Sequence, residues 1–179
     1  MARIGRDLIA QARMLARHEP RRPKQATLRR AVSTAYYGLF HFLIEESTAL
    51  LCGTGPRDAA FRQLAARAFV HAQMRSACEE FTKLNAKKVK ELLRPVWTRL
   101  AIGSNPQVKL IARTFIGLQD HRHTADYDLS VSFSRPLALS AVMRVEAAVN
   151  AWAQLKVSNP EVCRFCALAL ILWPSLARR

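Results

Sequence analysis

Apolar residues recur along most of the chain at spacings of three and four residues, the pattern that places side chains on one face of an α-helix. The clearest stripe runs through Leu28, Val32, Leu39 and Leu43. The alternation of period two that marks a half-buried strand is missing. The pattern predicts helices over residues 4–18, 26–51, 56–84, 107–121 and 137–157, a helix-prone stretch over 86–100 that Pro95 interrupts, and a short helix after Asn159-Pro160.

Proline and glycine mark the boundaries of these helices. The segment SFSRP offers Ser132 or Ser134 as an N-cap, with Pro136 in the first turn. No linker is long enough to divide the 179 residues into two domains. We therefore expect one all-α, up-and-down bundle of about five to six helices over residues 1–157. Residues 158–179 are expected to form a short C-terminal helix and tail docked on it.

The helical stripes also predict which side chains are buried. In the first helix these are Ile4, Leu8, Ala12 and Leu15. In the helix over 107–121 they are Val108, Ile111, Ala112, Phe115 and Leu118. In the helix over 137–157 they are Leu139, Val142, Met143, Ala147 and Val149.

Positive charge is concentrated in two segments. The formal net charge is +15, and residues 1–30 hold nine Lys/Arg against two acidic residues, while residues 83–99 hold six against one. Such clusters attract phosphate polyanions from a distance. We expect RNA or nucleotide phosphate as the partner, although a solvated basic face without a dedicated ligand fits the same charges. The side chains singled out for nucleic-acid binding are Arg21, Arg22, Lys24, Arg29, Arg30, Lys87, Lys88 and Lys90.

Other kinds of chemistry have little support in the sequence. Cys163 and Cys166 have zinc or redox spacing, but no second Cys/His pair matches them, so structural cysteines in a reducing cytoplasm are the simpler interpretation. No Gly-rich phosphate loop, HExxH or nucleophile elbow is present. The apolar run 166–172 is far shorter than the roughly 20 residues that span a bilayer. We expect a cytoplasmic protein with no membrane span, no metal and no cofactor.

The segment RRAVSTAYYGLFHFL, residues 29–43, is unusually aromatic. On a helix Tyr36 and Tyr37 point about 100° apart, so one packs in the core and the other is expected at the core edge with its hydroxyl bonded. His41 follows Tyr37 by four residues and shares its face. These rings form either plain helix–helix packing or one wall of a site.

The segment LQDHRHTADYD, residues 118–128, is harder to explain as packing, because it ends an apolar helix with clustered polar residues. Arg122 and Asp126 have i, i+4 spacing and can pair on one face. One interpretation is a polar helix end in which this pair holds the next loop. The other is a cationic pocket, in which Arg122 binds phosphate and His121 or His123 transfers protons.

Together the two segments resemble the HEPN superfamily (higher eukaryotes and prokaryotes nucleotide-binding), closest to its small single-domain prokaryotic members. Their helix A-Y-Y-x-x-F-H corresponds to residues 35–41, and their R-x-x-A-D-Y segment to residues 122–127. The resemblance covers roughly residues 5–155. It implies a helical bundle, commonly a homodimer, and many members are metal-independent ribonucleases. Several act as toxins beside a small nucleotidyltransferase antitoxin.

The family's ribonuclease pair is Arg, four to six residues, then His, and this spacing is missing around the segment 118–128. Arg113 precedes His121 by eight positions, and Arg122 is followed directly by His123. The catalytic pair therefore does not carry over. The resemblance carries over a pocket at Tyr36, Tyr37, His41, Asp126 and Tyr127, together with Arg122.

Three functions follow from these observations. The leading one is a HEPN-like RNA-binding or nucleotide-binding protein of a toxin–antitoxin or defence system. The second is a metal-independent ribonuclease toxin that uses Arg122 with His121 or His123. The third is a non-catalytic protein-interaction module. The lack of a spaced pair around residues 118–128 argues against an enzyme, and the charge clusters argue against a module that binds only protein.

Overall fold

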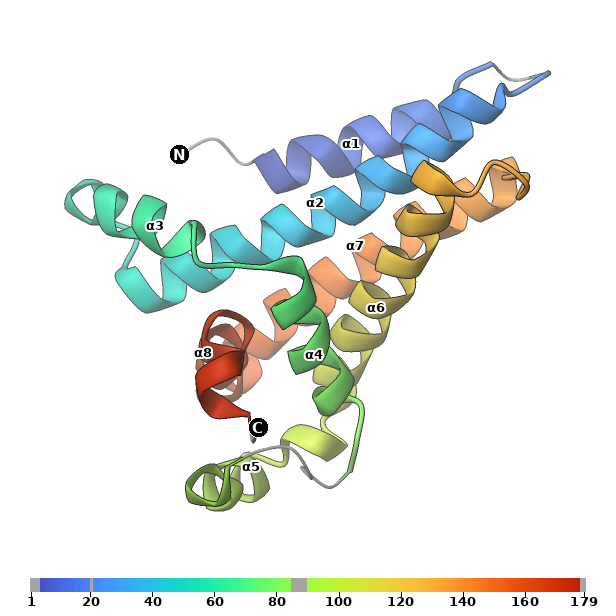
Figure 1. The fold of residues 1–179 in the computed structure, drawn as a ribbon. Coiled ribbons are helices and arrows are strands. Elements are labelled where there is room, and N and C mark those ends of the chain that lie inside the picture. Colours follow the sequence, from blue (N-terminus) through green and yellow to red (C-terminus); the bar gives the residue numbers. More distant parts are fainter. Residues whose placement is uncertain (1–3, 20, 85–89, 178–179) are drawn as a thin grey trace.

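The computed structural model describes residues 4–19, 21–84 and 90–177. This part of the chain forms an all-α bundle, as expected, and contains eight α-helices and no strand (Figure 1). Short 3-10 turns cover Pro56–Asp58, Glu91–Leu93 and Ile102–Ser104. The helices are α1 (Ile4–Arg17), α2 (Gln25–Cys52), α3 (Ala59–Ala66), α4 (His71–Phe81), α5 (Arg94–Arg99), α6 (Pro106–Tyr127), α7 (Arg135–Ser158) and α8 (Pro160–Leu176).

Glycines allow α1 to lie very close to α2. A Cβ added at Gly5 would lie 2.5 Å from the backbone nitrogen of Phe42, and one at Gly38 would lie 2.7 Å from Cγ1 of Ile9. Ala12 and Ala16 are fully buried on the same side of α1. Small residues on both helices therefore let the two backbones approach with little side chain between them.

Helices α2 and α7 contact each other through the middle of the bundle, and α1 and α6 pack against both of them. The five stripe residues predicted for α6 are all buried. Tyr36, Phe115 and Trp152 are among the largest buried side chains. The core thus consists mainly of the inner faces of these four helices.

A second group of helices covers one end of α2, α6 and α7. Helix α4 packs on α6 and α8, and α8 packs on α2, α4 and α7. The ring of Trp97 from α5 lies 5.8 Å from those of both Phe81 and Phe165. The buried residues of α8 belong to the same hydrophobic core as those of α2 and α7, while its other face is exposed.

Cys78 on α4 and Cys163 and Cys166 on α8 are buried. Burial raises the pKa of the Cys163 thiol to about 12 and raises those of the other two. All three thiols therefore stay protonated and unreactive at neutral pH.

Side-chain caps fix the start of the two long C-terminal helices. Asn105 accepts a hydrogen bond from the backbone N–H of Val108 at 3.0 Å, and Ser134 accepts one from Leu137 at 3.3 Å. A proline follows each cap in the first turn. Of the two serines proposed from the sequence, Ser134 is the N-cap.

Three details of the sequence interpretation are wrong. The single helix expected over 56–84 is divided into α3 and α4 by residues 67–70, so α3 projects from the bundle (Figure 1). Ile4 is 46% exposed, because α1 turns Gly5 and Ile9 toward α2 instead. Met143 and Ala147 are exposed, because α7 faces the core with Ala138, Ala141, Val145 and Ala148.

None of the described helices is long and apolar enough to cross a membrane.

Candidate nucleic-acid interface

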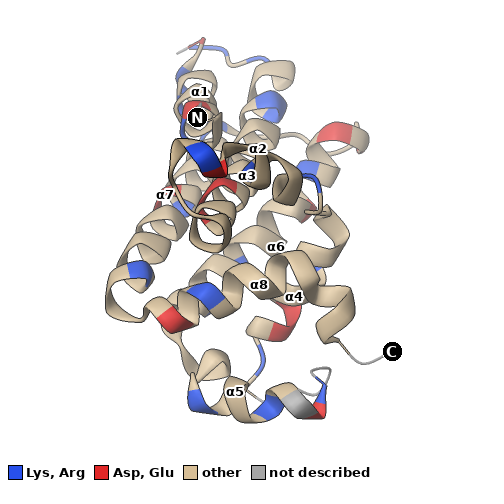
Figure 2. Ribbon diagram, turned by 90° about the vertical axis from the view of Figure 1, so that its left-hand side faces the viewer, with Lys and Arg blue, Asp and Glu red and all other residues tan. Residues whose placement is uncertain are grey.

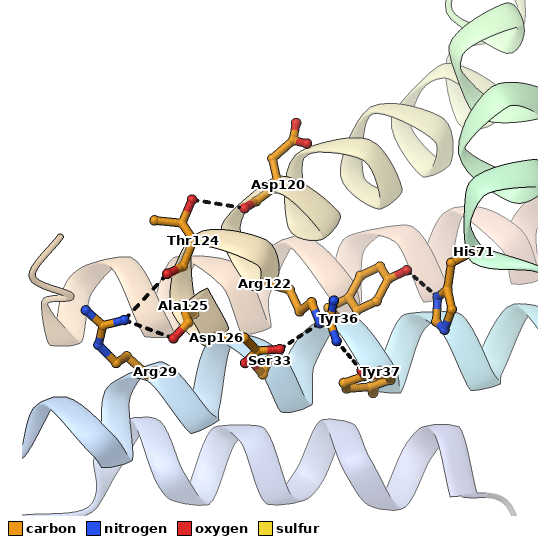
Figure 3. A network of polar contacts seen from close by, with 10 residues as sticks. All are labelled: Arg29, Ser33, Tyr36, Tyr37, His71, Asp120, Arg122, Thr124, Ala125 and Asp126. Carbon is orange, nitrogen blue, oxygen red and sulfur yellow. Dashed lines mark hydrogen bonds and ion pairs between the residues drawn. The ribbon is translucent and has the colours of Figure 1, made fainter. Parts of the chain in front are cut away.

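The two segments singled out in the sequence meet where α6 crosses α2 (Figure 3). Arg122 donates a hydrogen bond from Nη2 to the Tyr37 hydroxyl at 2.7 Å. Its Nε lies 2.7 Å from Oδ2 of Asp126. The N–H is not aligned with that oxygen, so this contact is an ion pair rather than a hydrogen bond. Asp126 also accepts a short hydrogen bond from Ser33 on α2.

Aromatic rings flank the guanidinium of Arg122. Its central carbon lies 5.4 Å from the ring centre of Tyr37 and 5.5 Å from that of Tyr127. Burial alone lowers the pKa of Arg122, but Tyr37 and Asp126 outweigh it and the pKa is raised. The arginine therefore remains charged in a half-buried position between two rings, of which Tyr127 is 65% exposed.

A residue that the sequence interpretation did not select, His71, completes the cluster. It is the first residue of α4, and its Nδ1 lies 2.6 Å from the hydroxyl of Tyr36. Its ring stacks on Phe40 with 3.8 Å between centres and lies edge-on to Tyr37. The sequence did not single out His71, because the prediction of one helix over 56–84 placed it inside a helix. In the structure it stands at the start of α4.

The surroundings of Tyr36 and His71 favour one protonation pattern for the two side chains. Tyr36 is 1% exposed, and burial raises the pKa of its hydroxyl, which therefore keeps its proton. Burial, followed by Arg122 and His41, lowers the pKa of His71. A neutral imidazole that accepts from Tyr36 at Nδ1 carries its own proton on Nε2. We infer that His71 is a neutral hydrogen-bond donor at pH 7.

Tyr36 and Tyr37 divide the roles that the sequence predicted. Tyr36 lies in the core, and Tyr37 lies at its edge with its hydroxyl bonded to Arg122. His41 is half-buried and edge-on to Phe40 at 5.4 Å, and burial lowers its pKa.

The histidines beside Arg122 in sequence face other neighbours. His121 turns toward α7: burial, followed by Arg144, lowers its pKa, and its Nδ1 is buried without a hydrogen bond in the described structure. His123 is exposed, and its ring centre lies 5.0 Å from that of Tyr127. Among the described residues, the hydrogen bond and ion pair of the Arg122 guanidinium go to Tyr37 and Asp126 rather than to either imidazole. The structure thus brings His71, rather than either of these, to the Tyr37 side of the cluster.

Arg29 has a structural role. It donates hydrogen bonds to the carbonyls of Ala125 at 2.9 Å and Asp128 at 3.0 Å, and also to those of Thr124 and Val131. Except for the Thr124 carbonyl, which also accepts from the backbone N–H of Asp128, these carbonyls lie beyond the last helical acceptor of α6. Whether Arg29 also contacts nucleic acid stays a prediction.

The other basic residues form two separate groups. Arg21, Arg22, Lys24 and Arg30 are exposed around the α1–α2 loop, where Lys24 pairs with Glu19 at 3.2 Å. Lys90 is exposed near α5, and its backbone N–H donates to Leu176. Lys87 and Lys88 lie outside the described residues. The α1–α2 loop and α5 occupy opposite ends of the molecule, so Lys90 lies far from the basic residues of the loop (Figure 2).

Three grooves lie elsewhere on the surface of the described residues. A groove of about 370 Å³ lies between the exposed edges of α1 and α7. Another of about 310 Å³ lies between α4 and α8, and a third of about 300 Å³ lies between α6 and α7. In the described part of the chain, no three His, Cys, Asp or Glu side chains gather as metal ligands.

Comparison of this chain with protein-family models, with curated proteins and with solved structures gives no match.

Proposed function

We propose that the protein binds single-stranded RNA through the surface where α2 and α6 cross, with the α1–α2 loop supplying long-range attraction. The observation that carries this proposal is the half-buried Arg122 between the rings of Tyr37 and Tyr127. Cations interleaved with aromatic faces bind single strands, because phosphates pair with the charges while bases stack on the rings.

The exposed rings suit a base rather than a closed small-molecule pocket. Tyr127 is 65% exposed, and His123 beside it is exposed as well. Stacking of one base on such a ring contributes roughly 1–3 kcal/mol and tolerates any base. We therefore expect binding with little sequence preference.

Charge close to this surface comes from the α1–α2 loop rather than from Arg122 alone. Asp126 offsets part of the Arg122 charge. Arg29 connects the start of α2 to the end of α6 and the following loop, so Arg30 and the basic loop lie at the same end of the bundle as Tyr127. A strand that stacks on Tyr127 can reach these cations, whereas the group near α5 lies at the opposite end of the molecule.

The test is fluorescence anisotropy with a labelled mixed-sequence RNA of roughly 15 nucleotides, at several salt concentrations. Tyr127→Ala should weaken binding by about 5- to 150-fold, the equivalent of one lost stacking contact. Replacing Arg21 and Arg22 together by Ala should lower the slope of log affinity against log salt by about 1.4, since each phosphate contact on a single strand contributes about 0.7. Arg113→Ala, an exposed arginine elsewhere on α6, is the matched control.

Absence of binding at low salt would refute the proposal, as would an affinity that does not change with salt. Equal losses of RNA affinity for Tyr127→Ala and Arg113→Ala would show that Tyr127 is not a specific part of the interface. Running the same samples on a denaturing gel detects RNA cleavage, which would favour the ribonuclease alternative. Membership of the HEPN superfamily and pairing with a nucleotidyltransferase antitoxin are proposals that rest on the two sequence motifs.

A further inference from the structure

The loop that joins α6 to α7 exposes aliphatic side chains at one end of the bundle (Figure 1). Leu129 is 86% exposed, Val131 is 40% exposed, and we call the two together the apolar tip. An RNA strand bound at Tyr127 makes no use of the apolar tip, because bases stack on rings rather than on aliphatic chains. The tip therefore requires an explanation beyond RNA binding.

The loop that carries the apolar tip is bound firmly to α2. Arg29 donates hydrogen bonds to the carbonyls of Asp128 and Val131. Gln25 exchanges two hydrogen bonds with the backbone of Phe133, both at 2.8 Å, and the side chain of Phe133 is buried. The exposure of the tip is thus a property of a loop held at both ends.

The same end of the bundle carries the basic α1–α2 loop. Arg135, at the start of α7, donates hydrogen bonds to the carbonyls of His18 at 3.2 Å and Glu19 at 2.6 Å, so the two loops are joined directly. The exposed cations of this end are Arg17, Arg21, Arg22, Lys24 and Arg30. Aliphatic and basic side chains therefore lie next to each other on one surface.

The acidic side chains of this end are already engaged by other groups. Glu19 and Asp126 form ion pairs. Asp128 accepts hydrogen bonds from the N–H and the hydroxyl of Ser130, which lower the pKa of its carboxyl group. The exposed cations outnumber these three carboxylates, so the surface around the apolar tip is positively charged.

We propose that this end of the bundle binds the surface of a membrane that contains anionic lipids, with the apolar tip inserted among the headgroups and the surrounding cations paired with lipid phosphates and carboxylates. Such binding is peripheral and requires no helix that spans the bilayer. The negative potential of an anionic leaflet attracts basic segments, and each Lys or Arg near the surface adds to the affinity.

The composition of this surface favours lipid over a protein partner. A protein interface uses roughly 20–30 residues on each side, and its core is depleted of charge. Here two aliphatic side chains stand among five exposed cations. A bilayer needs no matching shape, and shallow insertion of a few apolar side chains is sufficient when cations add to it. RNA would pair with the cations but would leave the tip in water.

The backbone beside the apolar tip also suits a medium with little water. An unbonded peptide group is costly in such a medium. The carbonyls of Asp128 and Val131 accept from Arg29, and the N–H of Ser130 donates to Asp128. These backbone groups are satisfied within the protein, which lowers the cost of inserting the tip.

The first test measures co-sedimentation with vesicles of phosphatidylcholine and phosphatidylserine in equal amounts. The wild-type chain should bind these vesicles at low salt, and should bind vesicles of phosphatidylcholine alone much more weakly. Leu129→Ser should lower the affinity by about tenfold or more, the equivalent of one leucine removed from lipid. The matched control is Leu64→Ser, because Leu64 is 68% exposed on α3, which follows the other end of α2.

A second measurement locates the apolar tip directly. The fluorescence of Leu129→Trp should be quenched by vesicles of the same composition whose phosphatidylcholine carries brominated acyl chains, whereas that of Leu64→Trp should not. The native tryptophans Trp97, Trp152 and Trp173 are buried and supply an unquenched background.

Absence of binding to the phosphatidylserine vesicles at low salt would overturn the proposal. So would equal losses of affinity for Leu129→Ser and Leu64→Ser, or a Leu129→Trp variant that binds the vesicles without being quenched. In the RNA titration, Leu129→Ser should bind as tightly as the wild type. If it lost affinity for RNA and kept its affinity for vesicles, the tip would belong to the RNA interface and the lipid proposal would be wrong.

Discussion

The hydroxyl oxygen of Tyr36 and Nδ1 of His71 are 2.6 Å apart, and they join the middle of α2 to the first residue of α4. Tyr36→Phe should cost about 1 kcal/mol of unfolding free energy, the usual loss for one hydrogen bond. It should also raise the pKa of His71, because the neutral ring loses the donor that favours it. NMR titration of the imidazole signals measures the pKa of His71 in the wild type and in Tyr36→Phe, with His121 as the internal reference. A His71 pKa that falls or stays constant would show that the tyrosine is not the donor.

The lowered pKa of His71 makes stability depend on pH. Its folded pKa lies below the unfolded value of about 6.5, so the unfolded chain binds more protons as the pH falls below that value. The free energy of unfolding should therefore decrease between about pH 7 and pH 5. His41 and His121 act with the same sign, and Glu45, whose pKa is raised by burial, acts with the opposite sign.

Comparison of variants isolates the part due to His71. Urea unfolding of His71→Asn at several pH values should give a shallower decrease than the wild type. The exposed His18 provides the control substitution, His18→Asn. Parallel curves for His71→Asn and the wild type would contradict this assignment.

The close contact of α1 with α2 predicts unequal responses to added methyl groups. Gly5→Ala and Gly38→Ala should each destabilise the protein by roughly 1–3 kcal/mol, because the new Cβ meets backbone or packed atoms. At Gly117 a Cβ meets only the guanidinium of Arg144, which can move aside. Gly117→Ala should therefore be neutral, or stabilising by up to about 1 kcal/mol from helix propensity. Equal effects at all three glycines in urea titrations would argue against the close packing.

Arg29 and Arg30 are adjacent but should behave differently. Arg29→Met removes the hydrogen bonds that hold the end of α6 and should destabilise the chain by about 2 kcal/mol. Hydrogen exchange of the last turn of α6 should accelerate at the same time. Arg30 is exposed and makes no ion pair within the described residues, so Arg30→Met should leave stability unchanged while weakening RNA binding. Equal melting temperatures for both variants would contradict the structural role assigned to Arg29.

Local patterns in the sequence were sufficient for the helices that make up most of the core. The stripe of α6, the cap at Ser134 and the i, i+4 pair of Arg122 and Asp126 all depend on residues a few positions apart. The break between α3 and α4 was missed because Arg67, Ala68 and Phe69 are compatible with a helix. Phe69 is buried at this break, and no proline or glycine marks it.

In the candidate site, too, the sequence did not predict contacts that depend on how whole helices pack. That Tyr37 and Arg122 approach each other was expected from two motifs, but the place of His71 depends on how α4 packs against α6 and brings its first residue to Tyr36 of α2. The orientation of α7 is likewise set by its neighbours. Its sequence offers two weakly apolar faces, and contact with α2 and α8 selects the one that contains Val145 and Trp152 over the one that contains Met143.

The buried thiols of Cys78, Cys163 and Cys166 make the separation of α8 from α4 measurable in the wild-type protein. A thiol reagent can reach them only while these helices are apart, so their labelling rate follows the equilibrium between closed and open forms. Cys52, which is partly exposed at the end of α2, reacts without such opening. One labelling experiment thus gives a fast phase for the surface and a slow phase for the interior, and the ratio of the two rates reports how often the C-terminal helix leaves the bundle.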